Sequence, residues 1–469
     1  MTVITRFAPS PTGFLHIGGA RTALFNFLFS KSNNGKFLIR IEDTDRERWS
    51  QHAEDAIIEG LEWLKIDADE PPVSQYSRKD RHIEIAKKML KEGSAYKCYL
   101  TQEEYQLQRA DHEKTNNQTR FLSPFREKTI SSKKPYTIRL KTPVCDQTTI
   151  NDIVQGRVTW ENKDLDDFIL VRSNGDPTYM LSVVVDDYDM QISHIIRGDD
   201  HLTNAARQSL IFKANNWKVP GFAHISLLHG SDGSKLSKRH GALGIEHYKN
   251  EGFPSEAVIN YLLGLGWHFP DKEIFSLDEA SEKFKLENLN KAPAKFDMDK
   301  LSNISSIYIK NSKESDLSFW FQQLGTTQTD QFYYSNLLNK INKGMGLFKN
   351  RAKTLLNIID DSFFMHCQPD QLKEKQSQIS LSKVQITLVE KFLNQLPKGI
   401  WIKEKININL NGFLTDNKIS LKDLGVPLRI ILTGSKNAPG IIDILLLLGE
   451  NEVRKRIVDY LKINNRQES

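Results

Sequence analysis

Cysteine is scarce in this chain of 469 residues, which contains only three. Cys98, Cys145 and Cys367 lie far apart, and no CxxC pair occurs. This usage argues against a disulfide framework and is typical of a reducing compartment, so we expect a cytoplasmic protein. Cys98 is expected to be a buried apolar residue.

Long apolar runs are also lacking. The longest covers residues 444–448, is extended by Ile441 and Ile442, is interrupted by Asp443 and ends at Gly449. A membrane-spanning helix needs about 20 apolar residues. The run therefore predicts the core of a buried strand or helix, and no secretory leader is visible.

A strong net charge is the third missing feature. The chain contains 64 Lys and Arg against 59 Asp and Glu, a formal net charge of +5. Any surface that binds RNA must therefore arise from local clustering of basic residues. The length suggests about three domains of ~150 residues. Composition agrees with a large soluble enzyme without identifying its reaction.

Two segments indicate nucleotide chemistry. Residues 6–19 read RFAPSPTGFLHIGG between a strand candidate at 3–7 and a helix candidate at 20–29. The free N–H groups of such a helix start bind phosphate, and the glycines let the backbone approach a nucleotide. Residues 235–239 read KLSKR in a glycine-flanked loop. A solvated basic loop is the ordinary alternative, but the pair predicts a site that splits ATP between its α- and β-phosphates.

The two segments resemble the signatures of the class I aminoacyl-tRNA synthetases, a His-Ile-Gly-His type turn and a Lys-Met-Ser-Lys-Ser type loop. Four further blocks look like those of the bacterial glutamyl branch, in its order: 41–46, 176–179, 184–187 and 196–201. The likeness covers most of residues 1–300. Nearer the C-terminus, only 425–429 and 433–434 are similar.

The resemblance implies an enzyme that joins glutamate to tRNA. It would form glutamyl-adenylate from L-glutamate and ATP with Mg²⁺, and pass the glutamyl group to the 3′-terminal adenosine of tRNA(Glu) with release of AMP and diphosphate. Some relatives hold zinc through a CxC pair, but Cys98 is followed by Tyr99 and Leu100, and His112 lacks partners at ligand spacing. We therefore expect no zinc and, by the family default, a monomer.

The resemblance also assigns the nucleotide contacts. His16, Lys235 and Lys238 are the implied catalytic residues, because an imidazole N–H and two ammonium groups would stabilise phosphate charge in the transition state. Gly19 replaces the second histidine of the signature, so His16 would act alone. The residues implied to bind ATP are Pro9, Ser10, Thr12, Gly13, His16, Gly18, Gly19, Lys235, Leu236, Ser237, Lys238 and Arg239.

A separate set is implied to select the amino acid. It consists of Arg6, Tyr179 and Arg197 for the side-chain carboxylate of glutamate, Glu42 for the α-ammonium group, and Ser10 and Asp200 nearby. Several of these residues lie at predicted strand ends, which converge at the ligand crevice of an open α/β sheet. A guanidinium only donates hydrogen bonds, so it would meet the amide NH₂ of glutamine donor to donor. Structural ion pairs are the alternative role for Glu42, Arg197 and Asp200, and Val183 replaces a polar contact of some relatives.

The apolar pattern predicts an α/β fold: a Rossmann-type parallel-sheet catalytic domain with an α+β insertion, followed by a mostly α-helical C-terminal region. A βαβ unit is expected at 3–42. Further expected elements are helices at 53–64, 83–90, 257–264, 347–358 and 384–396, and strands at 192–197 and 223–228. The resemblance implies the domains: 1–94 and 191–245 for the two catalytic halves, 95–190 for an inserted acceptor-end-binding domain, 246–310 for a stem-contact region and 311–469 for a helical anticodon-binding region.

Basic residues of the middle region suit contact with tRNA phosphates, although a solvated loop is the alternative. The polar runs at 111–119 and 131–135 are predicted loops. The candidates for tRNA contact are Arg120 and Arg126, with Lys128, Lys133 and Lys134, and Arg351 for the anticodon. An exposed arginine on a helix is the alternative for Arg351.

Other functions remain open at this stage. A glutaminyl-tRNA synthetase is disfavoured by Arg197 and by the helical C-terminal region, and a truncated paralogue that modifies a tRNA base lacks such a region. A catalytically inactive tRNA-binding paralogue, or another nucleotidyltransferase, is disfavoured by intact Lys235 and Lys238. Whether the enzyme also charges tRNA(Gln) with glutamate is left open.

Overall fold

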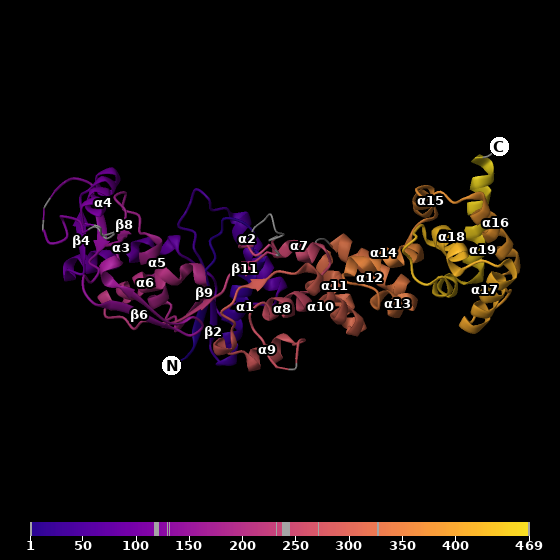
Figure 1. Cartoon of the computed structure of the whole chain (residues 1–469), viewed down its shortest axis with the longest axis horizontal. Coiled ribbons are helices and arrows are strands. Elements are labelled where there is room, and N and C mark those ends of the chain that lie inside the picture. Colours follow the sequence, from indigo (N-terminus) through magenta and orange to yellow (C-terminus); the bar gives the residue numbers. More distant parts are fainter. Residues whose placement is uncertain are drawn as a thin grey trace. The chain divides into compact units, whose positions relative to one another are not determined.

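The computed structural model describes residues 2–116, 122–128, 130, 132–230, 232–236, 244–270, 272–325 and 328–467. The chain folds into two compact units, of which unit 1 comprises Met1–Tyr248 and Ser255–Leu301 and unit 2 comprises Lys249–Pro254 and Ser302–Ser469. Figure 1 labels the elements along the chain. Each unit contains a buried hydrophobic core of its own.

A βαβ unit begins the chain, as predicted. Strands β1 (Ile4–Phe7) and β2 (Lys36–Ile41) pair in parallel, and helix α1 (Ile17–Ser32) connects them. Most of α1 is buried, including Leu24 and Leu28. A helix that is apolar on nearly all sides belongs in the interior, and α1 accordingly packs on the sheet.

The parallel sheet has two parts, one with strand order β1-β2-β3 and one with order β7-β6-β10-β9. Strands β6, β10 and β9 run parallel, and β7 returns antiparallel to β6. The N–H of Ser193 donates to the carbonyl of Ile4 at 2.9 Å, which joins the two parts beside β1. The bounds are β3 (Val73–Ser74), β6 (Gln147–Asp152), β7 (Gly156–Glu161), β9 (His194–Gly198) and β10 (Gly221–Ile225).

A small antiparallel sheet lies within the middle region. It is formed by β4 (Ala95–Cys98), β5 (Thr137–Leu140) and β8 (Ile169–Val171). The predicted fold class is thereby confirmed. Strands β6 and β7 also come from residues 95–190 but belong to the sheet with β9 and β10, because β6 pairs with β10. The five-part division of the chain stays a prediction.

The predicted loop at 111–119 is wrong over its described part, since 111–116 continue helix α4 (Gln102–Asn116). Thr101 caps this helix: its Oγ1 accepts the N–H of Glu104 at 3.1 Å, and Glu104 Oε2 accepts the N–H of Thr101 at 2.8 Å. This reciprocal pair satisfies two N–H groups at the helix start. The signal for the helix therefore lay before the polar run and not in it.

The other predicted elements of this region are present. The helices expected at 53–64, 83–90 and 257–264 are confirmed, and the strands expected at 192–197 and 223–228 appear slightly displaced as β9 and β10. The remaining elements before residue 296 are α2 (Gln51–Trp63), α3 (Lys79–Glu92), α5 (Tyr179–Asp189), α6 (Leu202–Ala214), β11 (Leu228–His229), α7 (Ile245–Asn250), α8 (Ser255–Gly264), α9 (Leu277–Lys283) and β12 (Ala294–Lys295).

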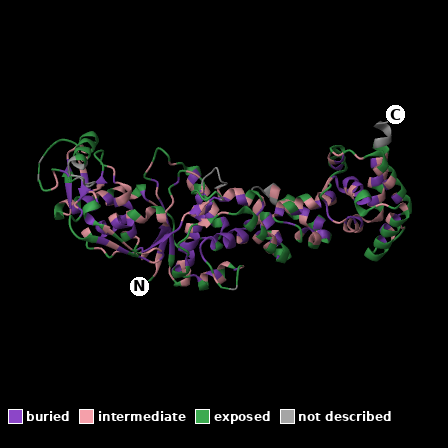
Figure 2. Cartoon of the chain, in the orientation of Figure 1, coloured by how far each residue is buried: buried purple, intermediate pink, exposed green. Residues whose placement is uncertain are grey.

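Unit 2 is helical in its described residues. Its helices pack around one apolar core, and Figure 2 shows their buried faces turned inward and their exposed faces outward. The apolar run at 441–448 proves to be helical, and the backbone turns after it at Gly449 (φ 73°, ψ 169°). The elements are α10 (Met298–Asn311), α11 (Glu314–Leu324), α12 (Gln328–Ile341), α13 (Met345–Lys349), α14 (Leu355–His366), α15 (Pro369–Ser377), α16 (Lys383–Gln395), α17 (Lys403–Asn417), α18 (Leu421–Thr433) and α19 (Ile441–Gln467).

The single helix predicted at 347–358 is wrong, because the chain breaks between α13 and α14. Thr354 starts α14 with a reciprocal cap, in which Asn357 Oδ1 accepts the N–H of Thr354 at 3.1 Å. Asn357 and Thr354 thus satisfy N–H groups that a continuous helix would have paired with its own carbonyls. Arg351 consequently lies in a turn, so its alternative assignment to a helix is also wrong.

Among the described residues, no helix has both the length and the hydropathy that crossing a membrane requires.

Gly35, at the turn into β2, provides a test of the βαβ packing. A Cβ at this position would lie 2.0 Å from the carbonyl oxygen of Val3, which accepts the N–H of Lys36 at 2.9 Å. Because the carbonyl of Val3 is backbone and cannot move aside easily, we expect Gly35→Ala to lower the free energy of unfolding of unit 1 by ~1–3 kcal/mol or more. This is the usual cost of overpacking. Thermal unfolding followed by circular dichroism measures this loss.

Gly264→Ala is the matched control, since nothing lies within 4 Å of a Cβ there. Equal melting temperatures for the two variants would contradict the proposed clash at Gly35.

Candidate active site

His16 occupies the first signature turn and caps helix α1. Its Nδ1 accepts the N–H of Gly19 at 3.1 Å. The ring proton therefore lies on Nε2, which remains able to donate. Desolvation by the surrounding protein, together with the charge of Lys235, lowers the pKa of His16. The ring is thus a neutral hydrogen-bond donor beside the free N–H groups of a helix start, which suits a phosphate.

The glycines of the turn leave little space beside this ring. A Cβ on Gly18 would lie 3.2 Å from the His16 imidazole, and one on Gly19 would lie 3.3 Å from Leu15. The carbonyl of Pro9 accepts the N–H of Glu42 at 2.8 Å, which fixes the turn against the end of β2. The predicted ATP residues Ser10, Thr12 and Gly13 lie in the same turn, where the N–H of Thr12 donates to the carbonyl of Ser10 at 2.9 Å.

The lysine loop is anchored on β11 at its N-terminal end and on the first turn at its C-terminal end. The N–H of Leu236 donates to the carbonyl of Leu228 at 2.8 Å, and the N–H of Ile245 donates to the carbonyl of Leu15 at 2.8 Å. His16 and Gly244 also form an isolated antiparallel bridge. The structure therefore brings Lys235 close to the first turn, where its charge acts on His16. The predicted residues Ser237, Lys238 and Arg239 lie outside the described residues.

A buried carboxylate connects several of the residues predicted to bind the amino acid. Asp187, on α5, lies 2.9 Å from Arg6 Nε of β1 and 2.6 Å from Arg40 Nη1 of β2. Although burial alone would raise it, the two guanidinium groups hold the pKa of Asp187 below its usual value. Glu42 lies 3.3 Å from Arg40 Nη2, and burial raises the pKa of Glu42 in spite of that contact. The ends of β1 and β2 are thus joined to α5 through charge.

Arg197 is buried at the end of β9 without such a partner. In the described part of the chain, no carboxylate lies within ion-pair distance of its guanidinium, and burial lowers the pKa of Arg197. Its Nε donates to His224 Nε2 at 3.1 Å and its Nη2 to the carbonyl of His201 at 3.3 Å. Its buried Nη1 has no hydrogen-bond partner among the described residues. A buried cation with an unused donor is suited to receive an anionic ligand.

The predicted amino-acid residues converge around this arginine. Arg6, Glu42 and Tyr179 all interact electrostatically with Arg197. Tyr179 is the first residue of α5, and burial followed by the charge of Glu42 raises its phenol pKa, so the hydroxyl keeps its proton at neutral pH. The arrangement offers a guanidinium and a phenol to a carboxylate, with the carboxylate of Glu42 nearby for an ammonium group.

Asp200 instead pairs with the lysine loop. Its Oδ2 is 3.0 Å from Lys235 Nζ, and this contact with Lys235 lowers the pKa of Asp200 although partial burial opposes the shift. Asp200 thus holds the first lysine of the loop in this structure. Its predicted contact with the amino acid stays a prediction.

The three candidate tRNA residues differ in their surroundings. Arg126 forms an ion pair with Asp167 and donates to the carbonyl of Thr142 at 2.8 Å, so its guanidinium is held within the fold. Arg351 lies 3.1 Å from Asp361 at the surface of unit 2. Arg120 lies outside the described residues. Their roles in binding tRNA stay predictions.

Four residues that hold the predicted ones in place were not predicted from the sequence. These are Asp187 and Arg40 on the Arg6 side, and His224 and Asp152 on the Arg197 side. Arg40 and His224 interrupt the apolar strands KFLIRI and GFAHI. A charged or imidazole side chain inside such a strand costs free energy unless it is paired. Its presence in the sequence therefore indicates a buried polar partner elsewhere in the fold.

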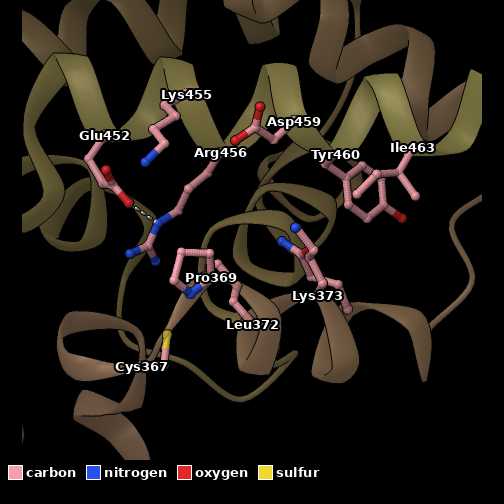
Figure 3. Close-up of a pocket in the computed structure, with 11 residues that line it drawn as sticks. Cys367, Pro369, Leu372, Lys373, Glu452, Lys455, Arg456, Asp459, Tyr460 and Ile463 are labelled. Atoms are coloured by element: carbon pink, nitrogen blue, oxygen red, sulfur yellow. Dashed lines mark hydrogen bonds and ion pairs between the residues drawn. The ribbon is translucent and has the colours of Figure 1, made fainter.

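A separate pocket lies among the helices of unit 2, between α15 and α19 (Figure 3). Arg456 donates from Nε to Glu452 at 2.7 Å and from Nη1 to the carbonyl of Leu432 at 2.6 Å. Cys367 also lines the pocket, and burial raises its thiol pKa, which disfavours the thiolate. The described lining therefore stabilises the fold and has no activated nucleophile.

Comparison with known proteins identifies the family. Residues 2–303 match the catalytic domain of the class I tRNA synthetases (E and Q), and residues 320–461 match an anticodon binding domain. Glutamate–tRNA ligase 2 of Paracoccus denitrificans is 42% identical over 97% of this chain and 98% of that protein. Glutamate–tRNA ligase 2 of Zymomonas mobilis is 43% identical over 99% of this chain and 97% of that protein.

A solved structure agrees with these relatives. The crystal structure of a glutamate tRNA ligase from Elizabethkingia meningosepticum in complex with its amino acid superposes with a TM-score of 0.81, at 30% identity, over 98% of this chain and 99% of that one. The chain therefore belongs to the class I tRNA synthetases, which use ATP. Within that class it is a member of the glutamate–tRNA ligase family.

The two functions of His16 can be separated by substitution. Asparagine is a good helix cap, so His16→Asn should preserve the melting temperature while removing the Nε2 donor. We expect ATP–diphosphate exchange to fall by about 10²–10³-fold, the usual loss of one transition-state donor.

His16→Ala should show the same kinetic loss and, in addition, a lower melting temperature, because the cap is worth ~1 kcal/mol. Exchange at the native rate in His16→Asn would show that the imidazole does not act on the phosphates.

Proposed function

We propose that the described site activates L-glutamate with ATP and transfers it to tRNA(Glu). The main support for this proposal is Arg197. Its buried guanidinium has an unused donor and no carboxylate partner among the described residues, and Tyr179 and Arg6 lie near it. Glutamate supplies the missing anion through its side chain. Glutamine would place an amide NH₂ against the same donors, and unpaired polar groups of this kind reject a near-isostere strongly.

The first step is in-line displacement at the α-phosphorus of ATP. An oxygen of the α-carboxylate of glutamate forms the new bond to phosphorus, and the bond to the β-phosphate oxygen breaks with release of diphosphate. His16 Nε2 donates to the phosphate oxygens, and Lys235 with Lys238 stabilises the charge that gathers on the leaving group. Asp200 holds Lys235 until the triphosphate takes its place.

Magnesium is proposed to enter with ATP, whose phosphate oxygens are its preferred ligands. In the part of the chain that the structure describes, no three His, Cys, Asp or Glu side chains are grouped to hold a metal ion.

The second step transfers the acyl group. The 2′-hydroxyl of the terminal adenosine of tRNA attacks the acyl carbon of glutamyl-adenylate, and AMP leaves. The matched anticodon binding domain supports selection of the tRNA by residues 320–461. We further propose a cytoplasmic enzyme, since its three cysteines are free, and a monomer, which is the default of the resembled family.

Aminoacylation with labelled glutamate tests the proposal. The assay is run separately with purified tRNA(Glu) and tRNA(Gln), and labelled glutamine serves as the matched control. We expect glutamate on tRNA(Glu) and no transfer of glutamine, because Arg197 distinguishes the two side chains.

Glutamate on both tRNAs would extend the function to a non-discriminating enzyme and would require a downstream amidating activity. Transfer of glutamine in preference to glutamate would contradict the proposed role of Arg197.

A further inference from the structure

Three buried side chains form a hydrogen-bonded row across neighbouring strands. Asp152 ends β6, His224 lies on β10, and Arg197 lies on β9. His224 and Arg197 are opposite each other in the parallel register of β10 and β9. His224 Nδ1 is 2.6 Å from Asp152 Oδ2, and His224 Nε2 is 3.1 Å from Arg197 Nε. The row ends at the guanidinium that faces the amino-acid site.

The contacts determine which nitrogen of His224 carries the proton. The carboxylate of Asp152 accepts the backbone N–H groups of Val154 at 3.0 Å and Gln155 at 2.8 Å on Oδ1. The backbone N–H of His224 donates to both oxygens at 3.1 Å, and Oδ2 is the oxygen that faces His224 Nδ1. An ionised carboxylate only accepts, so His224 Nδ1 must donate to it. Nε2 then has a lone pair and accepts the N–H of Arg197 Nε.

The ring in this row is neutral. Burial and the charge of Arg197 lower the pKa of His224, while Asp152 opposes the shift. A neutral acceptor matters because a carboxylate in the same place would pair with Arg197 and cancel the charge that a substrate needs. With Nε held by His224 and Nη2 held by the carbonyl of His201, the orientation of the guanidinium plane is fixed, and Nη1 is left without a partner in the part of the chain that the structure describes.

We propose that His224 is a positioning residue for amino-acid selection: its Nε2 lone pair orients Arg197 without neutralising it, and Asp152 fixes the tautomer that makes this lone pair available. This inference rests on the proposed function, because it assumes that Arg197 receives the side-chain carboxylate of glutamate.

Two amide substitutions separate this role from simple packing. In His224→Gln the amide oxygen reaches the place of Nε2 and keeps the acceptor for Arg197. In His224→Asn the shorter amide nitrogen keeps the place of Nδ1 and its bond to Asp152, but no acceptor reaches Arg197. If His224 only paired with Asp152, the asparagine variant would be the milder one. If it positions Arg197, the glutamine variant is the milder one.

We expect His224→Asn to raise the KM for glutamate by about tenfold or more, the usual effect of losing a charge-assisted hydrogen bond. The KM for ATP should stay within about twofold, because ATP does not contact Arg197 in the proposed site. His224→Gln should recover most of the affinity for glutamate. Aminoacylation of tRNA(Glu) with varied glutamate and ATP measures these constants.

Asp152→Asn tests the same point without altering the imidazole. Its Oδ1 can keep the backbone bonds, while its amide nitrogen would stand at the place of Oδ2 and donate to His224 Nδ1. The ring proton would then move to Nε2 and face the N–H of Arg197, so Nε2 could no longer accept from Arg197. Replacing the aspartate of a serine-protease triad by asparagine likewise gives the wrong histidine tautomer. We expect the KM for glutamate to rise here too, which keeps the test decisive if His224→Asn does not fold.

His82→Leu is the matched control. His82 is a second fully buried histidine of unit 1 and is paired with a carboxylate, with Nε2 2.8 Å from Asp186 Oδ1. Its removal should lower the melting temperature and leave the KM for glutamate unchanged.

The inference is overturned if His224→Asn and Asp152→Asn both keep the native KM for glutamate. It is also overturned if His224→Asn raises the KM for ATP as much as that for glutamate, or if His224→Gln is the more damaged of the two amide variants. Failure of the unaltered enzyme to charge tRNA(Glu) with glutamate would instead overturn the proposed function.

Discussion

The pairing of Asp187 with Arg6 and Arg40 is the interaction on which the proposed amino-acid site depends. It joins the first two strands of the sheet to helix α5, whose first residue is Tyr179. Removing one member of a buried ion group leaves an uncompensated charge, which usually costs 3–5 kcal/mol. The cluster therefore fixes three elements together at the strand ends, where ligands bind in an open α/β sheet.

Burial lowers the pKa of Arg197, and Arg6 lies close enough for its charge to lower that pKa further, yet only one of the two arginines has an ion-pair partner among the described residues. Arg6 is neutralised by Asp187, whereas Arg197 is hydrogen-bonded to the neutral ring of His224 and to a carbonyl group. Among the described residues, the site therefore keeps one buried positive charge without an ion-pair partner. Because an unpaired buried charge is costly, binding of an anionic side chain gains more free energy here than at the surface. This difference connects the fold to the proposed selection of glutamate by Arg197.

Helices, strands and turns could be predicted from the sequence where neighbouring residues determine them. The strand, turn and helix of the first 42 residues follow from apolar runs and glycines, and the resemblance then gave Arg6, Glu42, Tyr179 and Arg197 as site residues. The break between α13 and α14 at 350–354 was not predicted, because the helical spacing of apolar residues continues across it. The cap at Thr354 starts a new helix there. The helix at 102–116 was missed because its cap precedes a polar run.

The supporting contacts could not be predicted, because they depend on strand register. Asp152 and Arg197 are 45 positions apart in sequence and belong to strands on either side of β10. Only the pairing of β10 with both neighbours brings His224 between them. The sequence of a single strand does not show which strands will lie beside it. An imidazole inside an apolar strand indicates only that some polar partner exists.

The most direct test of the account is the crystal structure of this enzyme with L-glutamate bound. The account predicts that the side-chain carboxylate lies within hydrogen-bond distance of Arg197 Nη1, with His224 still accepting from Arg197 Nε. A glutamate whose side chain lies away from Arg197, with Nη1 still unpartnered, would contradict the claim that this buried charge selects the amino acid.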